Sequence, residues 1–383
     1  MDLIGTDYIW REKEVITDGI FDLAYGTDEN DFKLTVDQKI PDLVGGSLLY
    51  IAGTEYGGVV DKFGYSDSQG TVFYEGRSWS GVLDSKIILP NEVQETTRNT
   101  GYAIPEGTLF STAITDLLTF MGVLTENTST RTLDDGTSLT HDWTFLLRID
   151  DSIKNIPVVN NYVDPNESSP DDPNQEFKTL YMFDEFVTGY KGISDFIRAH
   201  GITLGFSIDY ITINNKKIIN PVLEFKPIVD YTTMEEFDKE TLPIEGAHLL
   251  NKTNHLIGLG NRIDNAQTRV NIHIYLKANG DLTTDVNEWG FSGVNEIARV
   301  EEFGQVQDEE CRRKAMKKMK EIVEEDDFKL TLYAEHPYQI GDIVGRRDEL
   351  MFGSEWIKQQ ITKKIVKLDG QDMTIDYEMG GVK

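Results

Sequence analysis

The side chains that could do chemistry in this chain begin with its single cysteine. Cys311 is the only cysteine among 383 residues, which excludes an intrachain disulfide and any zinc site built from several cysteines. It lies between Glu310 and Arg312 on a predicted helix, at the spacing of the apolar positions. This placement favours packing in a core over a role as a nucleophile.

The histidines do not follow a metal-binding or catalytic spacing. The chain has six, namely His141, His200, His248, His255, His273 and His336. None of them forms a His-Glu-x-x-His motif or a Cys/His pattern that would hold zinc. His248 and His255 share a segment predicted as loop and strand, where a metal pair is the weaker alternative to ordinary polar or packing roles.

Two glycine-containing segments partly match known motifs, the nucleophilic-serine turn and the dinucleotide-binding fingerprint, but neither match is complete. In residues 76–81 (GRSWSG) the second glycine comes one position too late for the turn that presents a nucleophilic serine. A strand-to-helix corner is the favoured interpretation. Residues 258–260 (GLG) lack the third glycine of a dinucleotide-binding fingerprint. We therefore predict no catalytic residues, no cofactor and no cofactor-binding residues.

Oxygen-bearing side chains are concentrated in residues 164–174. The segment contains Asp164, Asn166, Glu167, Asp171, Asp172 and Asn174. Their register is not that of a calcium-binding loop, and the prolines and the lack of apolar residues favour an exposed loop. No metal ligand is predicted, and calcium binding here stays an open alternative.

Paired carboxylates for glycoside cleavage also stay an open alternative. The chain has 66 acidic residues, so the choice of any one pair would carry no information.

The charge balance narrows the possible partners. The chain carries 66 acidic and 37 basic residues, a formal net charge of −29. Tight nucleic-acid binding needs Lys and Arg to release counterions from phosphates, so it is disfavoured. One interpretation is that self-repulsion keeps the chain in solution. The other is an acidic wall along which DNA passes without binding.

No membrane anchor or leader is predicted. The longest apolar runs, such as residues 45–53, are far shorter than the ~18–20 residues of a membrane helix. Residues 1–20 contain acidic side chains instead of a basic start followed by an apolar stretch. We therefore expect the chain to fold in a cytosol. Its length suffices for two or three domains.

The predicted elements indicate a β-rich α+β protein. Residues 59–76 and 361–380 each read as a hairpin, the second with an Asp369-Gly370 turn. Helices are predicted over 77–89, 108–121 and 193–200. A longer amphipathic helix, about 308–325, places Cys311, Ala315, Met316, Met319, Ile322 and Val323 on one face. We predict a first domain over 1–104, an α/β insertion over 105–249, and a second β-rich domain over 250–383.

Five segments taken together resemble a known family. They are residues 75–88 (EGRSWSGVLDSKII), 254–260 (NHLIGLG), 298–303 (ARVEEF), 338–344 (YQIGDIV) and the closing hairpin 361–380. In order and spacing they resemble the tail-tip, or baseplate, hub of siphophages, which is also the N-terminal structural part of tail-associated lysins. Each segment is short, and their order along nearly the whole chain carries the resemblance.

The resemblance implies a structural virion protein and no enzyme. Family members are homotrimers whose subunits each have two hub-type β-barrel domains, here 1–104 and 250–383, with the α/β insertion between them. Six barrels would form a pseudo-sixfold ring beneath the distal tail protein, in contact with the tape-measure protein and with receptor-binding or tip proteins. DNA would only pass through. The expected location is the virion's tail tip, assembled in the host bacterial cytoplasm.

Several alternatives remain open. A hub of a contractile injection machine or bacteriocin would share the fold and differ in its partners. A carbohydrate-active β-protein and a surface adhesin are less favoured. Because the sequence ends at Lys383, just past the last hairpin, a lytic C-terminal domain is expected to be absent or removed.

Overall fold

The computed structural model of the protein forms two compact units. It describes residues 1–26, 29–90, 102–105, 107–124, 128–133, 135–141, 143–163, 179–184, 186–234, 242, 244–247, 253–261, 270–291, 293–305, 308–324, 327–330, 338–347 and 356–381. Unit 1 comprises residues 1–241 and 332–382, and unit 2 comprises residues 242–331. The predicted β-rich α+β class is confirmed.

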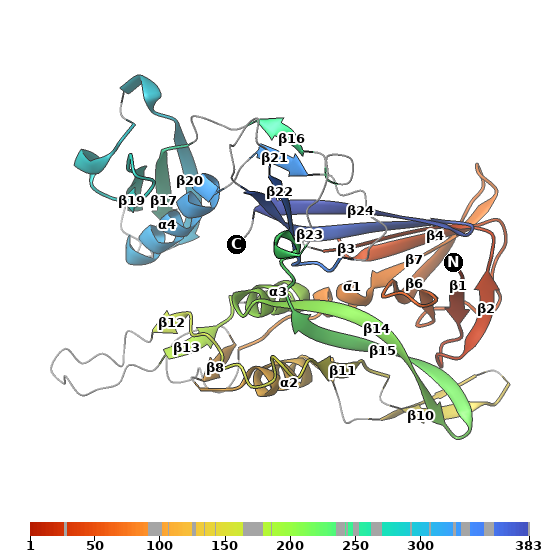
Figure 1. The fold of residues 1–383 in the computed structure, drawn as a ribbon. Coiled ribbons are helices and arrows are strands. Elements are labelled where there is room, and N and C mark those ends of the chain that lie inside the picture. Colours follow the sequence, from red (N-terminus) through yellow and green to blue (C-terminus); the bar gives the residue numbers. More distant parts are fainter. Residues whose placement is uncertain are drawn as a thin grey trace. The chain divides into compact units, whose positions relative to one another are not determined.

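Unit 1 is organised around a ten-stranded sheet (Figure 1). Its strands are β1 (Leu3–Thr6), β2 (Glu12–Ile16), β3 (Ile20–Gly26), β4 (Asp31–Val36), β5 (Leu48–Ile51), β6 (Gly57–Ser66), β7 (Thr71–Ser78), β22 (Ile343–Arg347), β23 (Trp356–Asp369) and β24 (Asp372–Gly381). The order is β2-β1-β5-β6-β7-β4-β3-β23, and both β22 and β24 pair with β23. Among the described strands the two ends of this sheet do not pair with each other, so it does not close into a barrel.

The C-terminal hairpin completes the sheet that the N-terminal strands begin. Strand β23 pairs antiparallel with β3, placing Val366 opposite Leu23 and Leu368 opposite Phe21, and all four side chains are buried. Residues 356–381 of the predicted domain over 250–383 therefore share a sheet with the first strands, whereas its residues up to 331 belong to unit 2. Both predicted hairpins, β6–β7 and β23–β24, are confirmed, and Gly370 supplies the positive φ of the second turn.

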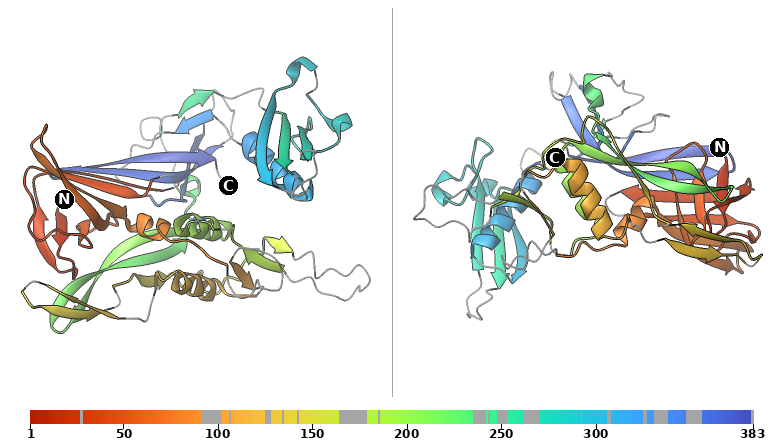
Figure 2. Two further views of the ribbon diagram at one scale, coloured as in Figure 1. Left: turned by 180° about the vertical axis from the view of Figure 1, so that it is seen from behind. Right: turned by 90° about the horizontal axis from the view of Figure 1, so that it is seen from below.

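Helices and a long hairpin cover the apolar face of the sheet (Figures 1 and 2). The helices are α1 (Trp79–Asp84), α2 (Phe110–Phe120) and α3 (Gly189–Ala199), and the hairpin is β14 (Ile202–Ile213) with β15 (Lys216–Pro227). Strand β11 (Leu146–Ile149) pairs parallel with β15. Short pairs are formed by β8 (Ala103–Pro105) with β13 (Thr179–Met182), β12 (Tyr162–Val163) with β13, and β9 (Ser129–Thr132) with β10 (Ser138–His141). The helices predicted at 108–121 and 193–200 are confirmed, whereas the helix expected over 77–89 is shorter and comprises only the six residues of α1.

Residues 102–122 and 181–201 share one local structure. Each copy runs from a short strand through a turn into an 11-residue helix, and residue n of the first copy corresponds to residue n + 79 of the second. The helices are followed by Gly122 and Gly201, which have the same φ of 66°. Strands β8 and β13, one from each copy, pair antiparallel with each other. The two copies are therefore related by an approximate twofold axis.

Each copy is completed by a segment from another part of the chain. In the first, Phe110 N donates to Ile156 O at 2.8 Å and the amide of Val158 donates back to residue 108. In the second, Gly189 N donates to Lys86 O at 2.8 Å and the amide of Ile88 donates back to residue 187. The hydrogen bonds are equivalent. The strand-turn-helix segments thus exchange partners across the repeat.

Comparison of the two copies identifies a residue with a strained backbone at the turn of the second copy. Phe186 has a φ of 52° where the first copy has Gly107, and its side chain is 57% exposed. An L-residue pays about 1–2 kcal/mol in this conformation, and glycine does not. We expect Phe186→Gly to leave the free energy of unfolding unchanged or to raise it by up to about 1 kcal/mol, since glycine also gains unfolded-state entropy. Urea denaturation measures this.

A matched variant separates strain from burial at this turn. Phe183, three residues earlier, is buried against Tyr102 and Phe196, so Phe183→Gly is expected to cost about 3–5 kcal/mol. A comparable loss in Phe186→Gly would show that the Phe186 ring is held by contacts within the folded chain.

Unit 2 is a small sheet covered by one helix. Its strands are β17 (His255–Asn261), β18 (Val270–Leu276), β19 (Leu282–Thr283) and β20 (Ala298–Gln305) in the order β19-β18-β17-β20, with α4 (Asp308–Glu324) on one face. A separate pair consists of β16 (Ile244–Ala247) and β21 (Asp327–Leu330). Ala315 and Met319 of α4 pack fully buried against Leu256 and Ile274. The predicted amphipathic helix and its buried stripe are confirmed.

Candidate functional site: the free edges of the large sheet

Strand β24 forms one free edge of the ten-stranded sheet. It pairs with β23 along its length, and its other side carries no strand among the described residues. Its side chains alternate: Tyr377 points into the core, while Thr374, Asp376 and Glu378 are exposed. A strand of ten residues with an unpaired row of backbone N–H and C=O groups is a ready template for another chain.

Strand β2 forms the opposite free edge. It pairs only with β1 among the described strands, and Val15 is 57% exposed. Glu12 accepts hydrogen bonds from Tyr50 Oη at 2.5 Å and Tyr210 Oη at 2.7 Å. Burial, and then the Glu12 carboxylate, raise the pKa of Tyr50, so this hydroxyl stays a donor. Beside the strand is a pocket of about 330 Å³ lined by Arg11, Glu12, Tyr210, Lys216, Lys217 and Ile219.

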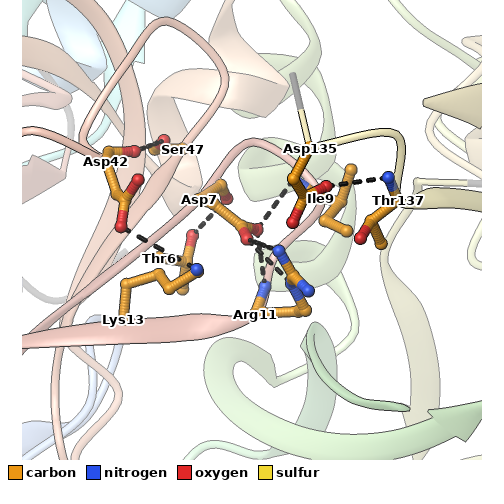
Figure 3. Close-up of polar contacts among 9 residues, drawn as sticks. All are labelled: Thr6, Asp7, Ile9, Arg11, Lys13, Asp42, Ser47, Asp135 and Thr137. Atoms are coloured by element: carbon orange, nitrogen blue, oxygen red, sulfur yellow. Dashed lines mark hydrogen bonds and ion pairs between the residues drawn. The ribbon is translucent and has the colours of Figure 1, made fainter. Parts of the chain in front are cut away.

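The turn that leads into β2 is fixed by one buried carboxylate. Figure 3 shows Asp7 between the backbone of this turn and the Arg11 side chain. Asp7 Oδ1 accepts from Ile9 N at 3.1 Å and Arg11 N at 3.0 Å, and Asp7 Oδ2 accepts from Arg11 Nε at 2.8 Å. Thr6 Oγ1 accepts a hydrogen bond from Leu48 N at 2.8 Å, which connects the same turn to β5. The free edge therefore starts from a rigid corner.

The solvent-facing side of the sheet carries alternating charges. Along one cross-strand row the order is Lys62, Glu75, Lys33, Asp22 and Lys367, from β6 to β23. Glu75 lies 2.8 Å from Lys62 and 3.6 Å from Lys33, and these lysines lower its pKa. Opposite charges directly across strands specify register. Along this row three lysines alternate with two acidic residues, so the row does not by itself form the acidic wall considered from composition.

A buried ion pair joins the C-terminal strand to the N-terminal half. Lys364 on β23 has a fully buried side chain and pairs with Glu55, which is also buried and accepts a hydrogen bond from Tyr25 Oη at 2.7 Å. Tyr25, Tyr56 and Tyr377 place their rings within about 6 Å of the Lys364 ammonium. Burial, and then Glu55, raise the pKa of Tyr25. This cluster fixes how β23 sits on β3.

The glycine motifs and the cysteine considered from sequence have structural roles. Ser78 ends β7 and caps α1 by accepting from Gly81 N at 3.3 Å, which confirms the strand-to-helix corner. Gly258 lies within β17, where a Cβ would come within 3.0 Å of Ala315; it lets α4 pack closely. Cys311 is buried beside Val270, and burial raises the pKa of its thiol.

A histidine cluster in unit 2 was missed by sequence spacing. His255 was considered only with His248, which lies outside the described residues, as do residues 164–178 with the possible calcium loop. In the structure His255 contacts His273 and Glu296 instead. The strand register, with Ile257 opposite His273, brings the two histidines together. Two histidines on consecutive strands of a hairpin are the only signal that the sequence offers.

Two further observations hold for the part of the chain that the structure describes. No group of three or more His, Cys, Asp or Glu side chains is arranged to hold a metal ion there. No helix in that part has the length and apolarity needed to cross a bilayer.

The chain has a β-rich fold in which two exposed edge strands, β2 and β24, are free to pair with another chain. Three solved structures of similar fold are described as tail or baseplate proteins. The first is a tail protein from Neisseria meningitidis MC58, with a TM-score of 0.47 and 12% identity, covering 99% of this chain and 96% of that chain. The second is the 43 kDa tail protein of prophage MuSo2 from Shewanella oneidensis, with a TM-score of 0.47 and 9% identity, covering 99% of this chain and 98% of that chain. The third is a chain of the phage P2 baseplate in its activated conformation with Ca, with a TM-score of 0.45 and 10% identity, covering 98% of each chain. No protein-family model and no curated protein matches the chain.

These descriptions name the class of protein to which the sequence bears its resemblance. The three structures are described as tail or baseplate proteins and not as enzymes. Identities of 9–12% and TM-scores below 0.5 leave the function to be argued from the chain's own geometry.

Proposed function

We propose that this chain is a non-enzymatic structural protein of a phage tail tip, in which identical copies assemble into a homotrimeric ring. The observation that carries the proposal is the pair of different free edges, β2 and β24, at opposite ends of one large sheet. Natural monomers usually shorten, charge, cover or interrupt such edges. Strand β2 is short and charged, with the sequence EKEVI, whereas β24 is long. Here β24 presents ten residues without a proline.

Two unlike edges favour a closed ring over a symmetric dimer. When edge β24 of one copy pairs with edge β2 of the next, the contact is heterologous, and a heterologous contact generates a ring when its rotation closes and an open filament when it does not. The same geometry makes each copy equivalent. A trimer of this kind fits the hub to which the sequence bears a resemblance.

The finer parts of the proposal follow the resemblance. Residues 1–104 and 250–383 would supply two hub-type barrel regions around the insertion 105–249, and strands from both regions already meet where β3 pairs with β23. The ring would connect the distal tail protein above to the tape-measure protein and the host-facing tip proteins. It would close or line the tail channel, with DNA only in passage. The location would be the virion tail tip, after assembly in the host cytoplasm.

Light scattering coupled to size-exclusion chromatography tests the ring. We expect a trimer for the unmodified protein, alone or once the distal tail protein is added. Val15→Asp on β2 and Thr374→Asp on β24 should each give monomers, because each places a charge on one pairing edge. Thr374 lies opposite Lys367, so the new carboxylate is compatible with the fold.

Mixing the two variants distinguishes a heterologous ring from other assemblies. Each variant keeps one intact edge, so an equimolar mixture should form dimers and nothing larger. Val44→Asp is the matched control, since Val44 is 41% exposed but lies outside both edge strands, and it should remain trimeric. A strict monomer for the unmodified protein under both conditions contradicts the proposal.

A further inference from the structure

A pocket of about 330 Å³ lies between the start of β2 and the hairpin β14–β15. Its lining residues are Arg11, Glu12, Tyr210, Lys216, Lys217 and Ile219. Three of these side chains are cationic and one is acidic, whereas the whole chain has 66 acidic and 37 basic residues. All the lining residues belong to unit 1. The charge of the pocket wall is therefore opposite to that of the chain.

Arg11 is held at the pocket by the buried Asp7 carboxylate. Asp7 Oδ2 accepts from Arg11 Nε at 2.8 Å and lies 2.8 Å from Arg11 Nη2, and Asp7 Oδ1 accepts from the Arg11 amide at 3.0 Å. Among the described residues, Arg11 Nη1 has no hydrogen-bond partner. Because a guanidinium carries five donor hydrogens, one side of it is fixed while donors remain for a ligand.

Lys217 is positioned without being neutralised. Its Nζ lies 3.6 Å from the centroid of the Tyr210 ring, a contact that holds the ammonium and leaves its positive charge in place. The ring is fixed in turn, since Tyr210 Oη donates to Glu12 Oε1 at 2.7 Å, and Tyr50 Oη donates to the same oxygen at 2.5 Å. Neither Lys217 nor Lys216 forms an ion pair with a residue that the structure describes.

Three carboxylates lie near these cations, and one of them reaches the pocket wall. Glu12 lines the pocket, and its Oε1 is occupied by the two tyrosine hydroxyls. Asp7 is buried against Arg11 and does not line the pocket. Asp135 lies near Arg11 in Figure 3 and is exposed, so salt and water screen its charge. A ligand in the pocket would thus meet three cations and one carboxylate at contact distance, where Coulomb interactions are strongest.

We propose that this pocket binds a small polyanion, whose phosphate or carboxylate groups contact Arg11, Lys216 and Lys217. A guanidinium binds such groups through paired N–H donors, and an ammonium binds them as a point charge. Arg11 and Lys217 are positioned before a ligand arrives, which lowers the cost of binding. The volume is at the lower end of small-molecule sites, so the occupant is of the size of pyrophosphate or citrate. Every lining group belongs to one chain, so the inference does not rest on the proposed ring.

Isothermal titration calorimetry of the full-length protein at low ionic strength tests the site, with inorganic pyrophosphate and citrate as separate probes. We expect one anion to bind per chain with a Kd of about 1 mM or lower. The affinity should fall as sodium chloride is added. The probe that binds more tightly identifies phosphate or carboxylate as the preferred group.

Three variants locate the binding in the pocket. Lys217→Met removes the charge and keeps an apolar side chain beside Tyr210, so it should weaken binding at least ~10-fold. Glu12→Gln removes the one carboxylate of the pocket wall and keeps an oxygen that accepts from the tyrosine hydroxyls, so it should tighten binding at least ~3-fold. Lys191→Gln is the matched control, since Lys191 is an exposed lysine of α3 outside the pocket, and it should bind as the unmodified protein does.

Three outcomes would overturn the proposal. The first is the absence of saturable binding of either anion to the unmodified protein. The second is unchanged affinity in Lys217→Met, and the third is an equal loss in Lys191→Gln, which would indicate attraction to positive charge anywhere on the surface. If circular dichroism shows that Lys217→Met is unfolded, Lys216→Gln takes its place, with the same loss expected and unchanged affinity refuting the site.

Discussion

Replacing Lys364 with methionine is expected to lower the free energy of unfolding by about 3–5 kcal/mol. The substitution leaves the buried Glu55 carboxylate without its cation, and an uncompensated buried charge is strongly destabilising. We expect this loss at neutral pH. Chemical denaturation followed by circular dichroism measures it.

The neighbouring lysine provides the control. Lys363 also pairs with carboxylates, and its own side chain is 11% exposed, but its partners Glu29 and Glu378 are about half exposed, so Lys363→Met should cost clearly less than Lys364→Met. The double variant Glu55→Met/Lys364→Met removes both charges and should recover part of the loss. Equal effects of the two single lysine variants would show that burial of Lys364 does not matter to stability.

Placing a carboxylate on the buried stripe of α4 is expected to unfold unit 2. Met319 is fully buried between Leu256, Ile274 and Ala315. Met319→Asp loses this packing and buries an ionisable group without a partner, at a combined cost of several kcal/mol, on the order of 3–5 or more. Hydrogen exchange should show α4 and β17–β20 losing protection while β3, β4 and β23 keep theirs.

Two further α4 variants locate the effect on the helix. Met316 is only partly buried beside the same cluster, so Met316→Asp should have a smaller effect in the same direction. Lys317→Asp changes an exposed position two residues from Met319 and should cost less than about 0.5 kcal/mol. Unchanged protection in Met319→Asp would contradict the assignment of the stripe.

Local elements could be predicted because their signals are local. The Asp369-Gly370 turn between alternating runs specifies a hairpin by itself, and Gly370 has the required positive φ. The helix α4 follows from a periodic apolar face with acidic residues at its start. These features needed no information about the rest of the chain.

Strand partners could not be predicted from the same patterns. Alternation shows which face of β23 is buried, but it does not identify β3 as the neighbour. The irregularity of the ladder between Ile361 and Lys363 also shifts the alternation, so that Lys364 points into the core and Lys363 lies on the opposite face against Glu29 and Glu378. A sequence of two adjacent lysines gives no sign of this. The His255–His273 contact was missed for the same reason, since register alone creates it.

The crossed repeat of unit 1 has a consequence for how the chain can be divided. Residues 102–122 are completed by 156–158, and residues 181–201 by 86–88, so no cut between the copies leaves both of them whole. If the two copies were separate chains, the same hydrogen bonds would run between two chains that exchange segments. The present molecule has the form expected of such a swapped dimer fused into one polypeptide.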